Sequence, residues 1–118
     1  MSFLSNFFKP KEASKQIKVL DVDVYKKAIE AEENLQLVDV RTKTEYNGGH
    51  INNAQQIDYF QQSAFKKAFE KFDKEAPLYL YCRSGQRSLQ AAKILDAMGF
   101  KEIYDLKGGY LAWKKVIQ

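Results

Sequence analysis

Cysteine and histidine are nearly absent from this sequence of 118 residues: each occurs once, as Cys82 and His50. A single cysteine cannot close a disulfide within the chain, so nothing calls for an oxidising compartment and we expect a cytoplasmic protein. A structural zinc site needs about four Cys or His ligands, which this composition does not supply. We therefore expect no metal site.

Long apolar runs are missing as well, and charge of one sign is not concentrated. No stretch approaches the ~20 apolar residues that a spanning helix needs, so no integral membrane segment is expected. The net charge is +4, but lysines alternate with acidic residues through 66–75. This pattern is typical of a solvated surface, so we expect no nucleic-acid partner.

The composition fits one globular domain, with 45% hydrophobic and 29% charged residues. Residues 1–15 differ from the rest and are interpreted as an N-terminal extension, followed by a domain over 16–118. Phe3, Leu4, Phe7 and Phe8 have helical spacing before Pro10. A short helix that packs on the domain or frays is favoured there over a surface anchor or a partner-docking segment.

Apolar segments that alternate with helical patterns predict the fold class. The expected strands are 17–20, 35–40, 54–57, 78–81 and 103–106. The expected helices run from an Asp21 N-cap to about 33–34, over 42–46, around 64–72, from 86 to a Gly99 C-cap, and from Gly108-Gly109 through Trp113. Such alternation predicts an α/β protein whose parallel sheet is covered by helices on both faces.

Three helices have an apolar stripe that should face the sheet. The expected inner faces are Val24, Ala28 and Ile29; Ala64, Phe65, Ala68, Phe69 and Phe72; and Leu89, Ala92, Leu95 and Met98. These stripes are interpreted as core packing.

Cys82 ends the strongest predicted strand, and ligands in parallel sheets bind beyond the carboxyl ends of the strands. The strand-to-helix junction puts its sulfur near the positive end of a helix. Ser84 and Gly85 let backbone N–H groups point inward, and Arg83 and Arg87 add positive charge. These features favour a reactive thiolate over the alternative, a buried cysteine that caps a core strand.

Two reaction classes use a cysteine in such a loop. Phosphatases of the tyrosine-phosphatase type, and related arsenate reductases, have a loop one residue longer, whereas Cys82 and Arg87 enclose 83–86. The tighter ring suits one extra sulfur atom on the cysteine better than a phosphoryl group. This spacing favours sulfur transfer.

Four segments together resemble a single-domain rhodanese: 37–41 (LVDVR), 45–51, 82–88 (CRSGQRS) and 108–113 (GGYLAW). The resemblance covers about residues 16–116. It implies a five-stranded parallel sheet flanked by helices and a six-residue active loop, Cys82 to Arg87. One departure is Asn52-Asn53, where many relatives have proline and glycine; it should change only local turn rigidity.

The resemblance implies a sulfurtransferase that works without a metal or organic cofactor. Cys82 would take sulfane sulfur from thiosulfate or a persulfide donor, become a persulfide, and pass the sulfur to cyanide, a small thiol or a protein cysteine. The binding residues would be the rest of the loop: Arg83, Ser84, Gly85, Gln86, Arg87 and Ser88. Their N–H groups would stabilise the persulfide, and Arg87 and Arg83 would hold the donor's sulfonate.

Two strand-end residues match the family's pattern: Asp39 and Arg41. Asp39 is expected to pair with a loop arginine or with Arg41 and support the shape of the site. His50 is expected in a structural turn, not as a base. A persulfide carrier with low turnover on small molecules remains the alternative function, since it would need the same residues.

Overall fold

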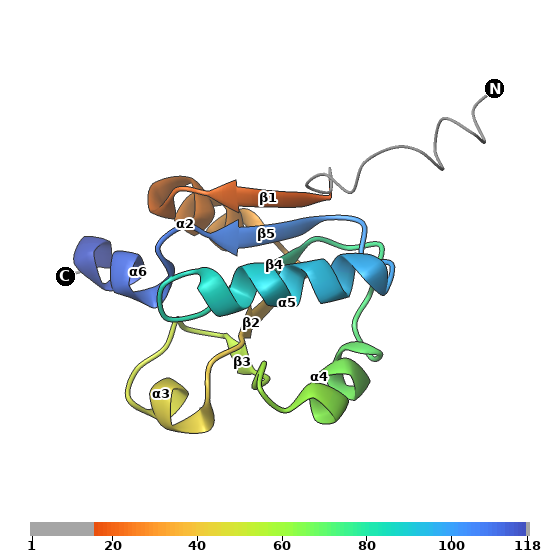
Figure 1. Ribbon diagram of the computed structural model, residues 1–118. Helices are drawn as coiled ribbons and strands as arrows, with labels where there is room; N and C mark the ends of the chain where they lie inside the picture. The colour runs from red at the N-terminus through yellow and green to blue at the C-terminus, as the bar shows by residue number, and fades with distance from the viewer. Residues whose placement is uncertain (1–15, 118) are drawn as a thin grey trace.

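Strands and helices alternate along residues 16–117, the part of the chain that the computed structural model describes (Figure 1). The strands are β1 (Ile17–Leu20), β2 (Gln36–Asp39), β3 (Gln55–Gln56), β4 (Leu78–Tyr81) and β5 (Ile103–Leu106). The helices are α2 (Val22–Ala31), α3 (Lys43–Asn47), α4 (Gln62–Phe69), α5 (Gln86–Ala97) and α6 (Gly109–Ile117). The expectation of a short helix within residues 1–15 lies outside the described residues.

All five strands form one parallel sheet in the order β1-β5-β4-β2-β3, which confirms the predicted fold class. β4 is the central strand, and it leads directly into Cys82. On one side Tyr81 is in register with Asp39 of β2, and on the other Leu80 is in register with Asp105 of β5. The cysteine therefore follows a strand that has a carboxylate residue on each flank.

Side-chain alternation along β4 divides the core between the two faces of the sheet. Leu78 and Leu80 pack in one cluster with residues of α4 and α5. Tyr79 and Tyr81 pack in a second cluster with residues of α2 and α6. Helices therefore cover both faces, as the sequence predicted.

All three predicted inner faces were wrong in part. Val24 is 52% exposed, while its neighbour Tyr25 is fully buried and donates a hydrogen bond from its hydroxyl to the carbonyl of Leu80, 2.9 Å away. This bond satisfies a buried polar group and sets the rotation of α2. Ala64 is exposed on α4, and Phe72 lies beyond the end of that helix.

The C-terminal end of α5 has the predicted glycine cap. Gly99 has a φ of 105°, its N–H donates to Asp96, and the N–H of Phe100 donates to Leu95 (3.2 Å). These bonds form a Schellman motif, and Phe100 closes it from the core. On the inner face of this helix Ser88 and Ala91 are buried, whereas Leu89 and Met98, expected there, are only half-buried.

Two further helices end at other residues than predicted. α2 ends at Ala31, earlier than expected, and α6 continues past Trp113 to Ile117. None of the helices within 16–117 is both long and apolar enough to cross a membrane.

Candidate active site

Cys82 lies between the sheet and α5, at the start of the β4–α5 loop. The residue is only 1% exposed. Its sulfur accepts a hydrogen bond from the backbone N–H of Gly85 (3.1 Å) and faces the Ser88 hydroxyl (3.4 Å). Two donors, one from the backbone and one from a side chain, therefore face the sulfur from the protein side.

Gly85 shapes the loop around the sulfur. It is the N-cap of α5 and has a φ of 108°, in the region that favours glycine. A Cβ atom would meet nothing closer than 3.7 Å, so backbone conformation and not space requires glycine here. This conformation turns the N–H at the positive end of a twelve-residue helix toward Cys82.

The first turn of α6 holds the loop from behind. The N–H of Tyr110 donates to the carbonyl of Cys82 (2.8 Å), and the N–H of Leu111 donates to that of Arg83 (3.1 Å). A Cβ atom on Gly109 would lie 2.5 Å from the Arg83 oxygen and 2.6 Å from the Cys82 oxygen. Only glycine allows this approach, which explains why the predicted Gly108-Gly109 turn belongs to the site.

Arg87, the last residue of the loop, is held by Glu45. Its two terminal nitrogens each donate to one carboxylate oxygen of Glu45, both at 2.8 Å. Arg87 lowers the pKa of Glu45 to about 2, with help from the backbone N–H of Thr42. Thr42 and Glu45 also form a reciprocal capping box at the start of α3. The pair therefore ties the loop to α3.

Sequence reasoning missed Glu45. The spacing Thr42-x-x-Glu45 signals a capping box, and that signal was present in the sequence. The partner in the loop was not visible, because Arg87 lies 42 residues further along the chain. The expectation that Arg87 binds a donor sulfonate stays a prediction.

Asp39 and Arg41 form a buried ion pair at the end of β2. The Arg41 side chain donates to both oxygens of Asp39, at 2.6 to 3.0 Å, and the Arg41 backbone N–H donates to the same carboxylate. The Arg41 guanidinium also donates to the carbonyl of Gly49 (2.7 Å) and lies 4.5 Å from the ring of Tyr110. The sequence left two partners open for Asp39, a loop arginine or Arg41. In the structure Asp39 pairs with Arg41.

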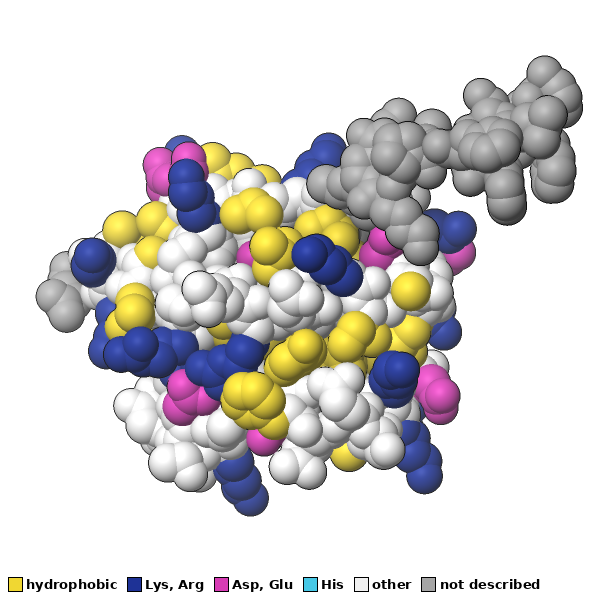
Figure 2. All heavy atoms as spheres, viewed as in Figure 1, with side chains coloured by type: hydrophobic (Ala, Val, Ile, Leu, Met, Phe, Trp, Pro, Cys, Tyr) yellow, Lys and Arg dark blue, Asp and Glu magenta, His cyan; other side chains and the backbone are white. Residues whose placement is uncertain are grey.

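The remaining loop residues lie at the mouth of the site. Arg83, Ser84 and Gln86 are exposed. Within residues 16–117 no carboxylate lies within ion-pair distance of Arg83. Figure 2 shows basic side chains gathered where the β4–α5 loop meets the start of α6. The mouth is therefore open to an anion.

Ser88 connects the sulfur to a second buried carboxylate, Asp105 of β5. Burial raises the pKa of Asp105 to about 6, and a hydrogen bond from Ser88 partly offsets this. The carboxylate oxygen Oδ1 of Asp105 has no hydrogen-bond partner within the described chain. The Ser88 hydroxyl has one proton and two acceptors within hydrogen-bond distance, the Cys82 sulfur and the Gly85 carbonyl.

His50 lies in the turn after α3. Its ring stacks on Tyr46 at 3.6 Å, and its Nδ1–H donates to the Tyr46 carbonyl (2.9 Å). These contacts suit the structural position expected from the sequence. Across 16–117, no three His, Cys, Asp or Glu side chains gather into a group able to hold a metal ion.

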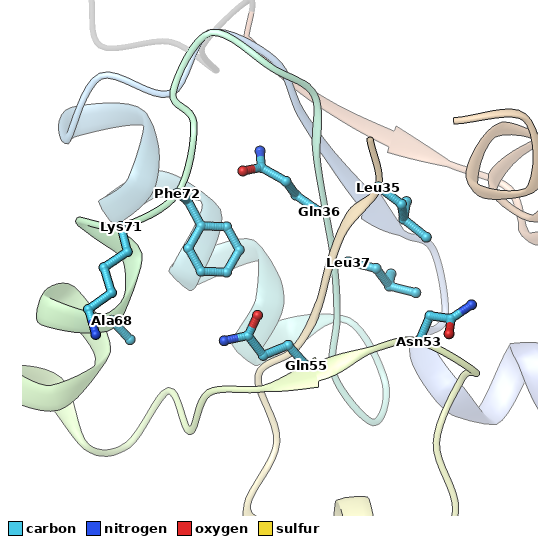
Figure 3. Close-up of a pocket in the computed structure, with 8 residues that line it drawn as sticks. All are labelled: Leu35, Gln36, Leu37, Asn53, Gln55, Ala68, Lys71 and Phe72. Atoms are coloured by element: carbon cyan, nitrogen blue, oxygen red, sulfur yellow. The ribbon is translucent and has the colours of Figure 1, made fainter. Parts of the chain in front are cut away.

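A separate groove lies toward the amino ends of β2 and β4, away from Cys82 (Figure 3). It has a volume of about 330 Å³, between β2, β3 and the end of α4. Its single charged lining residue is Lys71, beside Gln36, Gln55 and Phe72. It therefore holds no nucleophile or acid–base pair.

The five-stranded parallel sheet with helices on both faces is a rhodanese-like α/β fold. The rhodanese-like domain family matches residues 21–116, and the chain belongs to this family.

Similar proteins come from several bacteria. The putative sulfurtransferase YtwF of Bacillus subtilis is 36% identical over 84% of this chain and 92% of its own. The thiosulfate sulfurtransferase GlpE of Coxiella burnetii is 38% identical over 66% of this chain and 70% of its own. The uncharacterized protein YqhL of Bacillus subtilis is 42% identical over 66% of this chain, but the match spans only 60% of YqhL.

A solved structure agrees with the fold. The rhodanese-like domain protein from Staphylococcus aureus superimposes with a TM-score of 0.71 at 30% identity, covering 81% of this chain and 90% of that one.

Proposed function

We propose that this protein is a sulfurtransferase that carries sulfane sulfur as a persulfide on Cys82. The observation that carries the proposal is the convergence of the Gly85 N–H and the Ser88 hydroxyl on one buried sulfur. Relatives named as sulfurtransferases support it. The lone free cysteine, which a reducing environment preserves, supports a cytoplasmic location.

The first half-reaction uses a donor such as thiosulfate. The Cys82 thiolate attacks the outer sulfur, the S–S bond of the donor breaks, and its electron pair leaves with sulfite. The product is a Cys82 persulfide, whose charge the Gly85 N–H and the other loop donors stabilise. Arg83, exposed and without a carboxylate partner within the described chain, is suited to the donor's sulfonate.

In the second half-reaction the sulfur leaves for an acceptor. A thiolate attacks the outer persulfide sulfur, the Sγ–S bond breaks, and Cys82 returns as a thiolate. Small thiols, cyanide and a cysteine of another protein are all chemically competent acceptors. No metal or organic cofactor takes part in either half-reaction.

A persulfide carrier is the second candidate, and the burial of Cys82 favours it. A sulfur on a residue that is 1% exposed is shielded from small reductants. A phosphatase is disfavoured, because both terminal nitrogens of Arg87 are engaged by Glu45 and the loop has the shorter spacing.

The test combines turnover with mass spectrometry. Incubation with thiosulfate should add the mass of one sulfur atom to the wild-type chain, and added cyanide should remove it with formation of thiocyanate. Cys82→Ser should lose both the mass gain and the turnover, while its far-UV circular dichroism matches wild type. Full activity in Cys82→Ser would overturn the proposal. A stable mass gain with very slow release to small acceptors would identify the carrier.

A further inference from the structure

A small polar pocket lies beside the mouth of the Cys82 loop. It has a volume of about 240 Å³, and its walls come from the end of α3 with the following glycine turn, from Arg83, and from the first turns of α6. Arg83 adjoins Cys82, and Leu111, which lines the pocket, donates its N–H to the Arg83 carbonyl. A backbone hydrogen bond therefore connects the wall of the pocket to the residue that follows Cys82.

The pocket has an excess of positive charge. Four charged residues line it: Arg41, Glu45, Arg83 and Lys114. Asp39 neutralises Arg41, and Arg87 engages Glu45. Within 16–117 neither Arg83 nor Lys114 has a carboxylate at ion-pair distance. Two uncompensated cations in a partly enclosed space attract an anion.

The size of the pocket limits what it holds. Ligand pockets for drug-sized molecules have volumes of roughly 300–1,000 Å³, so this one suits a group of a few heavy atoms. Gly49 keeps one wall bare: a Cβ atom there would lie 2.8 Å from the Tyr110 hydroxyl. A carboxylate or sulfonate on a short chain fits these limits better than a nucleotide does.

We infer that this pocket selects the sulfur acceptor: a small thiol that carries a carboxylate, with its carboxylate bound by Arg83 and Lys114. The inference rests on the proposed sulfurtransferase function and adds the acceptor class. Sulfite leaves before the acceptor enters, so Arg83 serves the donor's sulfonate and the acceptor's carboxylate in turn. The acceptor's thiolate then attacks the outer sulfur of the Cys82 persulfide. One S–S bond forms, the Sγ–S bond breaks, and no external oxidant is consumed.

Lys114 is the residue to test, because it lies on α6 and takes no part in holding sulfur. Lys115, the next residue along α6, is exposed and does not line the pocket, so it is the matched control. Wild type, Lys114→Gln and Lys115→Gln are loaded with sulfur from thiosulfate. Release of the sulfur is then timed with 3-mercaptopropionate, which is anionic, and with 2-mercaptoethanol, which is neutral.

The rate of each variant is divided by the wild-type rate for the same thiol, which cancels the intrinsic reactivity of the thiol. Lys114→Gln should slow release to 3-mercaptopropionate five- to tenfold and change release to 2-mercaptoethanol less than twofold. Added salt should reduce the difference. Lys115→Gln should match wild type with both thiols. Equal slowing with both thiols, or equal effects of the two lysines, would overturn the inference.

A binding measurement separates this inference from the proposed function. In Cys82→Ser, 3-mercaptopropionate should shift the amide NMR signals of Gly49 and Leu111, and the added Lys114→Gln change should abolish these shifts. If wild type takes up no sulfur but the shifts occur, the proposed function fails and the anion site stands. If sulfur transfer occurs and the shifts do not, the anion site fails.

Discussion

Asp39 and Asp105 are buried carboxylates on the two strands that flank β4, and they differ in how their charges are met. Asp39 accepts hydrogen bonds from the backbone and side chain of Arg41, a residue of opposite charge. Asp105 has no cation beside it, and its Oδ1 has no hydrogen-bond partner within the described chain. Both are nearly inaccessible, at 0% and 2% exposed.

The difference lies in how the free-energy cost of burying each carboxylate is offset. Burial of a carboxylate is costly unless a partner of opposite charge and hydrogen bonds compensate. Arg41 compensates Asp39, so this pair can frame the site without leaving a buried charge unpaired. Asp105 lacks such a partner, and burial raises its pKa to about 6. Its protonation therefore changes within the range that a cell can reach.

Breaking the compensated pair should have the largest effect. Asp39→Asn leaves the Arg41 guanidinium buried without its counter-charge, which should lower the free energy of unfolding by about 3–5 kcal/mol. Urea denaturation at pH 7 measures this. As a control, Asp39→Asn combined with Arg41→Gln removes both charges and should recover part of the loss. A loss below about 1 kcal/mol in the single variant would contradict the structural role of the pair.

Removing the uncompensated charge of Asp105 should change the free energy of unfolding by less than Asp39→Asn does. Near neutral pH the change should be in the opposite direction, toward a more stable fold. The pKa of Asp105 is about 6 in the fold against an ordinary value of 3.8, so the folded chain binds this proton more tightly. Its stabilising contribution is complete below pH 3.8 and is lost as the pH rises through 6. That loss is on the order of 2–3 kcal/mol.

Asp105→Asn should therefore flatten the pH dependence between pH 4 and 7. The difference in free energy of unfolding between variant and wild type, from urea denaturation across this range, should move in favour of the variant as the pH rises. Taking the difference cancels the other carboxylates, which both proteins share. A constant difference across the range would mean that Asp105 does not titrate there.

The Glu45–Arg87 ion pair is reached by solvent, unlike the Asp39–Arg41 pair. Replacing Glu45 should therefore have the smallest effect on the free energy of unfolding. The side chains of Arg87 and Glu45 are 20% and 28% exposed. Glu45→Gln should lower the free energy of unfolding at pH 7 by about 0.2–1 kcal/mol, as for other solvent-screened pairs. Because the pKa of Glu45 is lowered to about 2 from 4.5, this contribution exists above pH 4.5 and is lost as the pH falls toward 2.

Thermal unfolding of wild type and Glu45→Gln at pH 7 and pH 3 tests this. The gap between the two proteins should narrow at pH 3. A gap as large as that of Asp39→Asn would show that exposure does not distinguish the two ion pairs.

The features that could be predicted from the sequence are those that depend on residues close together in the chain. Apolar runs revealed the strands, and the Gly99 cap followed from one glycine after an apolar stripe. Tyr25 was missed as a core residue, because Val24 competes with it on hydropathy alone. The hydrogen bond that decides between them ends on Leu80, 55 residues away.

The same distinction applies to the candidate site: its contiguous loop could be predicted, and its contacts between distant elements could not. The loop residues follow one another in the chain, so their order alone predicted a candidate site at Cys82. The Glu45–Arg87 pair, the Ser88–Asp105 contact and the pocket beside Lys114 each join residues from different elements. Only the order of strands in the sheet brings them together.

The contact of Gly109 with the back of the loop has a consequence for the protein during its synthesis. The ribosome makes β4 and the Cys82 loop before α6, whose first-turn N–H groups hold the Cys82 and Arg83 carbonyls. A nascent chain that has not yet released α6 therefore lacks the support behind its loop. We therefore expect the Cys82 loop to reach its folded geometry only after α6 has emerged from the ribosome.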